Sequence, residues 1–268
     1  GPKPDWMANA PAALGKQLAS WKTAAKKAGL AHRFDEIAVL ARPAIDLALK
    51  KAKPADLKKV VSRLGGDPDL PAGFAWPVVD GVALTFVAQI VIADMKVHDL
   101  DARLPAAGLL AVFAQLDATA AAYGEVCRVV LFPFDATLVR TASPPGVKRP
   151  IRSAGTFAPK LRLTLPPSEG PAIDGLGLNA DERAAYHDDL FLGAIPEGRL
   201  HRLLGWPSAA THHGIAGHAF LLQIDSEDRI DFEMGDAEQL RIFVDGPAGA
   251  RPLDANALAG AVCTLSEA

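Results

Sequence analysis

The apolar residues among the first 64 positions recur at helical spacing. One helix face is lined by Leu14, Leu18, Trp21, Ala25 and Ala28. Their 4-3-4-3 spacing predicts an amphipathic helix, and the following Gly29 is suited to end it. A second stripe begins at Leu30 and continues through Phe34, Ile37 and Ala41 to Pro43, which stops or kinks a helix. We predict two further helices, over residues 44–51 and 54–64.

After Gly66 the helical period gives way to short apolar runs between prolines and glycines, which is typical of strands. We predict strands over residues 84–92, 108–116, 126–134, 160–165, 219–225, 238–244 and 261–265, and a loop over residues 141–158. One helix over residues 181–190 follows a capping box at Asn179 and Glu182. Helices followed by strands favour an α+β fold. We therefore expect a helical N-terminal segment, residues 1–64, docked on a β-rich body of mostly antiparallel strands, residues 65–268.

Two short strings in the β-rich body resemble each other. The run FVAQI at residues 86–90 returns as FLLQI at residues 220–224, and an apolar strand with a phenylalanine follows each. Because side chains alternate between the faces of a strand, both faces of both runs are apolar, so both strands should be covered on both sides. A glutamine buried there needs hydrogen-bond partners. We predict that Gln89 and Gln223 are buried at equivalent places of two related β-units; chance similarity of short strings is the alternative.

Composition and charge narrow the class of protein. Half of the 268 residues are hydrophobic, which is typical of a packed globule. Residues 1–64 carry 13 basic and 5 acidic side chains, whereas residues 65–268 carry 15 and 26. This asymmetry indicates either an anionic partner or, as we favour, a basic helical layer on an acidic body. Few aromatic residues and an acidic body argue against nucleic-acid binding.

The apolar runs are too short for a membrane span, so we expect no membrane association and a cytoplasmic location. The two cysteines, Cys127 and Cys263, lie in apolar strand-like runs. We expect buried free thiols in preference to a disulfide.

Several strings, taken in order, resemble the YwqG-like family. They are SRLGGDPDLPAGFAWP (62–77), LTFVAQI (84–90), LPAAGLL (104–110), HRLLGWP (201–207), LLQIDS (221–226) and GDA (235–237). The resemblance covers residues 60–265. It implies a β-rich α+β fold and no particular activity, because the function of that family is unknown. Members resemble proteins encoded in bacterial toxin–immunity neighbourhoods. Two departures are Met234, where an aromatic residue is common, and the lack of a glutamine over residues 208–212.

The candidate binding residues all lie in these strings: Trp76, Gln89, His201, Trp206, Gln223, Asp225 and Asp236. Asp225 and Asp236 flank an acidic stretch that we interpret as a solvated hairpin, in which both carboxylates would serve Asx-turns. The stretch does not follow the order of a calcium loop. Five histidines fall at positions 187, 201, 212, 213 and 218. Without a companion metal motif, we interpret them as solvated loop residues. We expect no metal and no cofactor.

Two hypotheses about function remain at this stage. The first is a non-enzymatic binding protein with a protein partner; in its most specific form, the protein is a bacterial toxin-immunity protein. It is favoured by the absence of a recognisable nucleophile elbow or phosphate loop in the sequence. The alternative is a hydrolase or metal-assisted enzyme that uses the His187–His218 region with Asp225 and Asp236. That enzyme would bring at least two histidines and one carboxylate together.

Overall fold

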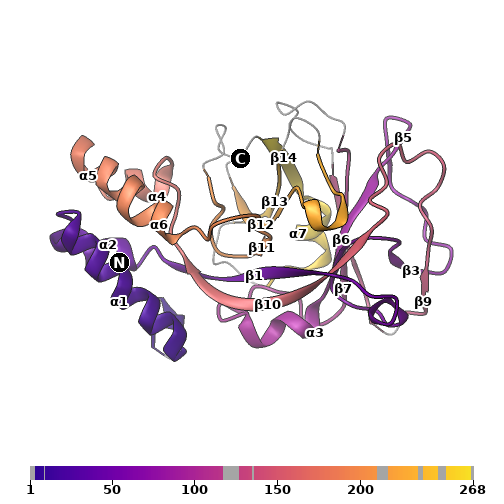
Figure 1. The fold of residues 1–268 in the computed structure, drawn as a ribbon, viewed down its shortest axis with the longest axis horizontal. Helices are drawn as coiled ribbons and strands as arrows, with labels where there is room; N and C mark the ends of the chain where they lie inside the picture. Colours follow the sequence, from indigo (N-terminus) through magenta and orange to yellow (C-terminus); the bar gives the residue numbers. More distant parts are fainter. Residues whose placement is uncertain are drawn as a thin grey trace.

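A ten-stranded antiparallel sheet forms the centre of the molecule in a computed structural model that describes residues 4–8, 10–116, 127–134, 136–209, 217–234, 238–246 and 252–266 (Figure 1). The strand order is β14-β13-β12-β11-β1-β10-β2-β6-β7-β8. These strands are β1 (Arg42–Lys51), β2 (Arg63–Gly65), β6 (Thr85–Val91), β7 (Leu109–Ala114), β8 (Cys127–Phe132), β10 (Ala154–Thr164), β11 (Arg202–Leu203), β12 (His218–Asp225), β13 (Gln239–Asp245) and β14 (Val262–Ser266). Two small ribbons pair β3 (Asp69–Pro71) with β9 (Leu138–Arg140) and β4 (Val78–Val79) with β5 (Val82–Ala83).

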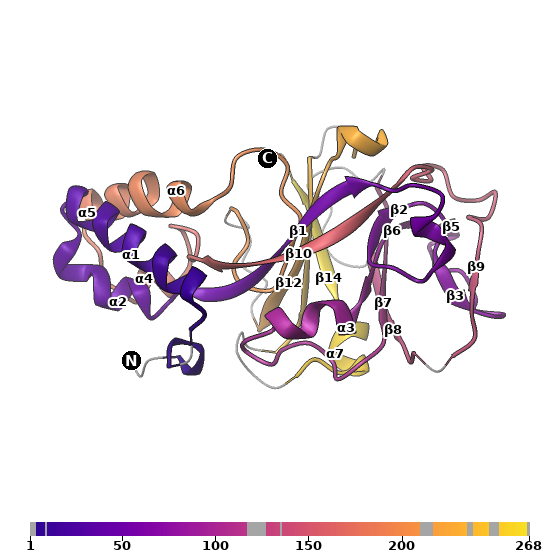
Figure 2. The ribbon, with the colours of Figure 1, turned by 60° about the horizontal axis from the view of Figure 1, so that its bottom comes forward.

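A lobe of helices lies at one end of the long strands β1 and β10 (Figures 1 and 2). It contains α1 (Ala12–Lys27), α2 (Phe34–Ala38), α4 (Pro171–Asp174), α5 (Ala180–Ala185), the π-helical turn η5 (Tyr186–Phe191) and α6 (Leu192–Ala194). Both predicted stripes face the core of this lobe, where Trp21, Leu30 and Phe34 are buried. The Gln17 amide joins α1 to β10, because it donates to the Leu163 carbonyl and accepts from the Leu163 N–H, both at 2.9 Å.

The remaining helices are short. They are η1 (Asp5–Met7), η2 (Ala31–Arg33), η3 (Asp56–Lys58), α3 (Ile92–Met95), η4 (Lys96–His98), η6 (Asp228–Ile230) and α7 (Ala255–Ala259). No helix in the described ranges is both long and apolar enough to cross a membrane.

The sheet consists of two related halves. The first runs β1, β2, β6, β7, β8 and the second runs β10, β11, β12, β13, β14. The two long strands pair with each other at the centre, and each also pairs with the short strand of the other half, β1 with β11 and β10 with β2. Each half contains a register shift at the same place, between Phe86 and Ala88 and between Phe220 and Leu222. An approximate two-fold axis between β1 and β10 thus relates the halves.

The twisted sheet brings its two outer parts side by side, with β8 next to β14 (Figure 2). The main core lies between them and contains, among others, Ile90, Val112, Leu222, Ile224 and Ile242. A separate apolar cluster with Phe86 and Phe113 covers the other face of the first half. Every residue of β6 is buried, as expected for a strand covered on both sides.

The α+β class is confirmed, and each of the seven predicted strands overlaps an observed one. The capping box at Asn179 is also confirmed, although the helix behind it continues as the π-helical turn η5. The predicted helices over residues 44–51 and 54–64 are wrong, because β1 occupies Arg42–Lys51 and β2 occupies Arg63–Gly65. The alternating Ala and Leu residues of β1 fit either period, and ten residues of pairing with β10 decide for a strand.

The loop predicted over residues 141–158 ends earlier than expected, since β10 begins at Ala154. Gly155 allows close pairing there: a Cβ atom on it would lie 2.6 Å from Leu49 Cγ. Pro43 is accommodated near the start of β1, beyond the two residues that pair with β11.

Candidate functional site

Gln89 is fully buried, and its amide makes three hydrogen bonds to groups inside the protein. Its Oε1 accepts from the Asp69 N–H at 3.0 Å. Its Nε2 donates to the Val61 carbonyl at 2.9 Å and to Asp69 Oδ2 at 2.8 Å. Asp69 in turn pairs with Arg63 at 2.9 Å and Arg140 at 2.8 Å. Gln89 therefore fixes the connection from β2 to β3 against β6.

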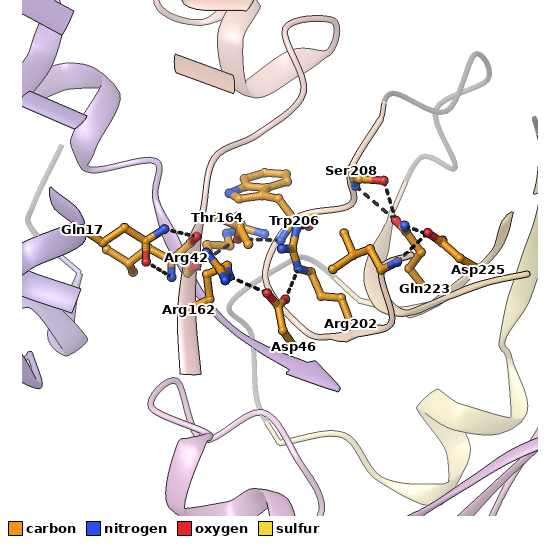
Figure 3. Close-up of polar contacts among 12 residues, drawn as sticks. Gln17, Arg42, Asp46, Arg162, Thr164, Arg202, Trp206, Ser208, Gln223 and Asp225 are labelled. Carbon is orange, nitrogen blue, oxygen red and sulfur yellow. Dashed lines mark hydrogen bonds and ion pairs between the residues drawn. The ribbon is translucent and has the colours of Figure 1, made fainter. Parts of the chain in front are cut away.

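Gln223 is also fully buried, and it fixes the segment after β11 against β12 in the second half (Figure 3). Its Oε1 accepts from the N–H of Ser208 at 3.2 Å and from the hydroxyl at 2.9 Å, and its Nε2 donates to Asp225 Oδ1 at 2.9 Å. Gln89 lies opposite Arg63 and Gln223 lies opposite Arg202. In both halves the backbone N–H that the glutamine accepts belongs to the sixth residue after that arginine. The prediction that the two glutamines are buried and equivalent is confirmed.

The two candidate tryptophans brace loops. Trp76 Nε1 donates to the Leu84 carbonyl at 2.8 Å, and its ring packs edge-on against Phe113 at 5.3 Å. Trp206 Nε1 donates to the Leu40 carbonyl at 2.8 Å, and the Arg42 guanidinium lies 3.8 Å above its ring (Figure 3). Each indole is thus tied to a neighbouring chain segment.

A buried carboxylate that the sequence did not single out lies between the long strands. Asp46 of β1 accepts from Arg202 Nε at 2.7 Å and from Arg162 Nε at 2.5 Å (Figure 3). It joins β1, β10 and β11 at the two-fold axis. Its role was hidden because residues 44–51 were predicted as a helix, in which Asp46 would not face two strands.

His201 and Asp225 form a buried polar contact behind the 226–234 hairpin. The Asp225 N–H donates to His201 Nδ1 at 3.3 Å, and Asp225 Oδ2 accepts from the Leu200 N–H at 2.7 Å. Burial raises the pKa of the Asp225 carboxyl, against the hydrogen bonds from Leu200 and Gln223. His201 is only 2% exposed, so its interpretation as a solvated loop residue is wrong. The Asp225 carboxylate accepts from the Leu200 N–H and from Gln223 Nε2 of its own strand, so it does not form the predicted Asx-turn.

Glu227 continues this network to the surface of the hairpin. Its Oε2 lies 3.2 Å from His201 Nε2, which is the donor because Nδ1 accepts. Arg229 donates to both Glu227 oxygens, with Nε at 2.7 Å and Nη2 at 2.6 Å, and its Nη1 donates to the Leu49 carbonyl at 2.6 Å. Burial alone would raise the pKa of Glu227, but the hydrogen bonds from His201 and Arg229 lower it well below its ordinary value. The hairpin is thereby fastened to β1.

An open cleft of about 730 Å³ lies between residues 148–152 and residues 228–233. One wall carries the exposed Lys148, Arg149 and Arg152, and the other carries the exposed Asp228, Asp231 and Glu233. Apolar Leu116, Ile151 and Phe232 also line it. Within the described ranges, neither the two arginines nor Asp231 and Glu233 form an ion pair. The acidic hairpin is solvated at its tip, as expected, but Asp225 and Glu227 are buried.

The basic wall is fastened to the first half. The Arg149 carbonyl accepts from Thr85 Oγ1 at 3.1 Å, and the Ile151 carbonyl accepts from the Gly66 N–H at 2.8 Å. Gly65 has φ +68°, and a Cβ atom on it would lie 2.3 Å from the Ser153 carbonyl oxygen. The strings around Gly65 and His201, which carried the family resemblance, therefore hold the two opposite walls of the cleft.

The other predicted residues do not gather at one place. His187 lies in the helical lobe, with Nδ1 2.8 Å from Ser168 Oγ. His218 pairs with Asp245 at 3.0 Å on the far end of β12. His212, His213 and Asp236 lie outside the described residues. Across the part of the chain that is described, no three His, Cys, Asp or Glu side chains are arranged to hold a metal ion.

The fold and the cleft define an α+β protein built from two related halves, with an open charged groove beside the axis. A profile of the family described as "Domain of unknown function (DUF1963)" matches residues 62–248. The match covers more than half of the chain, and the protein belongs to this family. No curated protein matches the sequence.

Proposed function

We propose that this protein is a non-enzymatic binding protein whose cleft, between residues 148–152 and 228–233, holds a segment of a protein partner. The single observation that carries the proposal is the pair of opposed charged walls of the cleft. Arg149 and Arg152 on one wall, and Asp231 and Glu233 on the other, form no ion pair among the described residues. Such exposed charges give an approaching partner electrostatic guidance and specificity. A polypeptide segment that carries both signs of charge complements such a groove.

The positions of the polar side chains that could take part in catalysis support this proposal. Gln223, Asp225, His201 and Glu227 form one connected network, and all are buried. Their hydrogen bonds are directed at one another and at the backbone, which suits a scaffold that holds a wall in place. The alternative of a hydrolase or metal-assisted enzyme requires a second histidine beside His201. The described His187 and His218 lie elsewhere, bonded to Ser168 and Asp245.

The finer proposal concerns the partner. The resemblance to the YwqG-like family, with its link to bacterial toxin–immunity neighbourhoods, favours a toxin encoded beside this protein in a bacterial cytoplasm.

The test is affinity capture from lysate of the native host, with any toxin encoded alongside supplied in addition. Wild type is compared with two neutralised variants, Arg149→Gln/Arg152→Gln and Asp231→Asn/Glu233→Gln. Asn is chosen because residue 231 has φ +52°, a conformation that Asn tolerates. We expect wild type to retain a specific protein. Both variants should bind that protein with an affinity lower by roughly 10-fold or more.

Matched controls carry the same change of charge on the helical lobe: Lys22→Gln/Lys26→Gln and Asp188→Asn/Asp189→Asn, all exposed. These should retain the partner. If the lysate yields a small molecule and no protein, the proposal fails. Equal loss of the partner from the control variants would place the binding surface elsewhere.

A further inference from the structure

Two cysteines that are far apart in the sequence meet where the outer strands of the sheet come together. Cys127 begins β8 and Cys263 lies in β14; both are fully buried free thiols, as predicted. Cys127 Sγ lies 3.9 Å from the carbonyl oxygen of Ala261, two residues before Cys263. Interaction with the Cys127 side chain, together with burial, raises the pKa of the Cys263 thiol.

The position of this pair in the sheet is unusual. β8 is the last strand of the first half and β14 is the last strand of the second, so they are the two edges of the ten-stranded sheet. In the described ranges, no ladder of backbone hydrogen bonds joins β8 to β14. Side chains of both strands nevertheless share the main core, where Cys127, Val129, Cys263 and Leu265 are buried together.

We propose that Cys127 and Cys263 are a thiol–disulfide exchange site, at which a small-molecule disulfide such as oxidised glutathione converts the pair to a disulfide that joins the two sheet edges. One thiolate attacks a sulfur of the small molecule, forming a mixed disulfide and releasing one thiol. The second protein thiolate then attacks the protein sulfur of that mixed disulfide and releases the second thiol. The two electrons of the protein dithiol end on the released thiols, which also take up the two protons.

The structure sets the conditions for this reaction. A buried thiol with a raised pKa is rarely ionised, and the thiolate is the reactive form, so the closed molecule should react slowly. Among the described residues, β8 and β14 can separate without breaking a ladder of backbone hydrogen bonds between them. Once formed, the disulfide links residues distant in the chain, and such a link restricts the unfolded state strongly.

The test uses the full chain and oxidised plus reduced glutathione as the probe. Protein refolded from urea in this buffer is compared with protein refolded in dithiothreitol. We expect an intact mass lower by two hydrogens, a proteolytic peptide pair linked through Cys127 and Cys263, and a Tm higher by roughly 5–15 °C. Dithiothreitol should reverse all three changes.

The variants Cys127→Ala and Cys263→Ala, which keep the sites apolar, should show none of these changes. Should refolding fail, the same exchange is followed on folded protein held in urea below its unfolding midpoint. Glutathione adducts on the separate cysteines without a link would overturn the proposal. So would a linked protein whose Tm is unchanged or lower, because the thiols would then not be positioned for an unstrained bond.

Discussion

At the residue scale, one amide fixes each half of the molecule. Gln89 and Gln223 each accept from a backbone N–H in the connection that follows a short strand, and each donates to a carboxylate. The carboxylate partners, Asp69 and Asp225, are buried as well, so replacing the amide by a hydrocarbon leaves buried polar groups without a hydrogen bond. The penalty for such groups exceeds any gain from the more apolar side chain.

Replacing either glutamine by leucine should therefore destabilise the protein. We expect Gln89→Leu and Gln223→Leu each to lower the free energy of unfolding by about 1–3 kcal/mol, measured by urea denaturation. Gln115→Leu is the control, since this half-buried glutamine lies at the end of β7. A Gln223→Leu protein as stable as the Gln115→Leu protein would show that the amide network contributes nothing.

Glu227 gives stability a dependence on pH. Its pKa is lower in the folded protein than its ordinary value of 4.5, so its ionised form stabilises the fold above that value. This stabilisation should be lost as the pH falls through about 4.5 towards the folded pKa. Glu227→Gln should flatten the acid limb of a plot of urea midpoint against pH. The exposed neighbour Glu233→Gln should keep the wild-type profile, and identical profiles for both variants would refute this role.

At the element scale, the connections that hold the cleft depend on backbone conformation. Gly65 and Gly81 both have positive φ, +68° and +78°, but only Gly65 is crowded. A Cβ atom on Gly65 would meet the Ser153 carbonyl and Ile151, whereas nothing lies within 4 Å of one on Gly81.

The comparison of two alanine variants isolates that crowding. Gly65→Ala should cost at least about 1 kcal/mol more than Gly81→Ala in the free energy of unfolding, because both bear the strain of positive φ and only one adds a clash. Gly65→Ala should also shift the backbone amide resonances of residues 148–152. Equal stability of the two variants would mean that the basic wall gives way without cost.

Local patterns predict some elements well and others badly. The stripes of α1 and α2 and the two glutamine strands were predictable because each depends on a period within one segment. β1 was not, since its Ala and Leu residues suit a helix as well and its pairing partner β10 lies more than a hundred residues away. The burial of His201 was not predicted for the same reason, because its hydrogen-bond partner Glu227 lies in another segment of the chain.

At the scale of the whole molecule, the two-fold arrangement exchanges strands between the halves. β1 of the first half pairs with β11 of the second, and β10 of the second pairs with β2 of the first. The 228–233 wall belongs to the second half but is fastened to β1 through Arg229, and the 148–152 wall precedes β10 but is fastened to the first half. The cleft therefore exists only in the assembled sheet, which is why no single stretch of sequence predicted it.

The central claim, that a protein partner occupies the cleft, is tested most directly by hydrogen–deuterium exchange of the complex with the captured partner. The backbone amides of residues 148–152 and 228–233 should both become protected when the partner binds, while the exposed face of α1 stays unchanged. Protection confined to the helical lobe, with both cleft walls exchanging as in the free protein, would contradict the account.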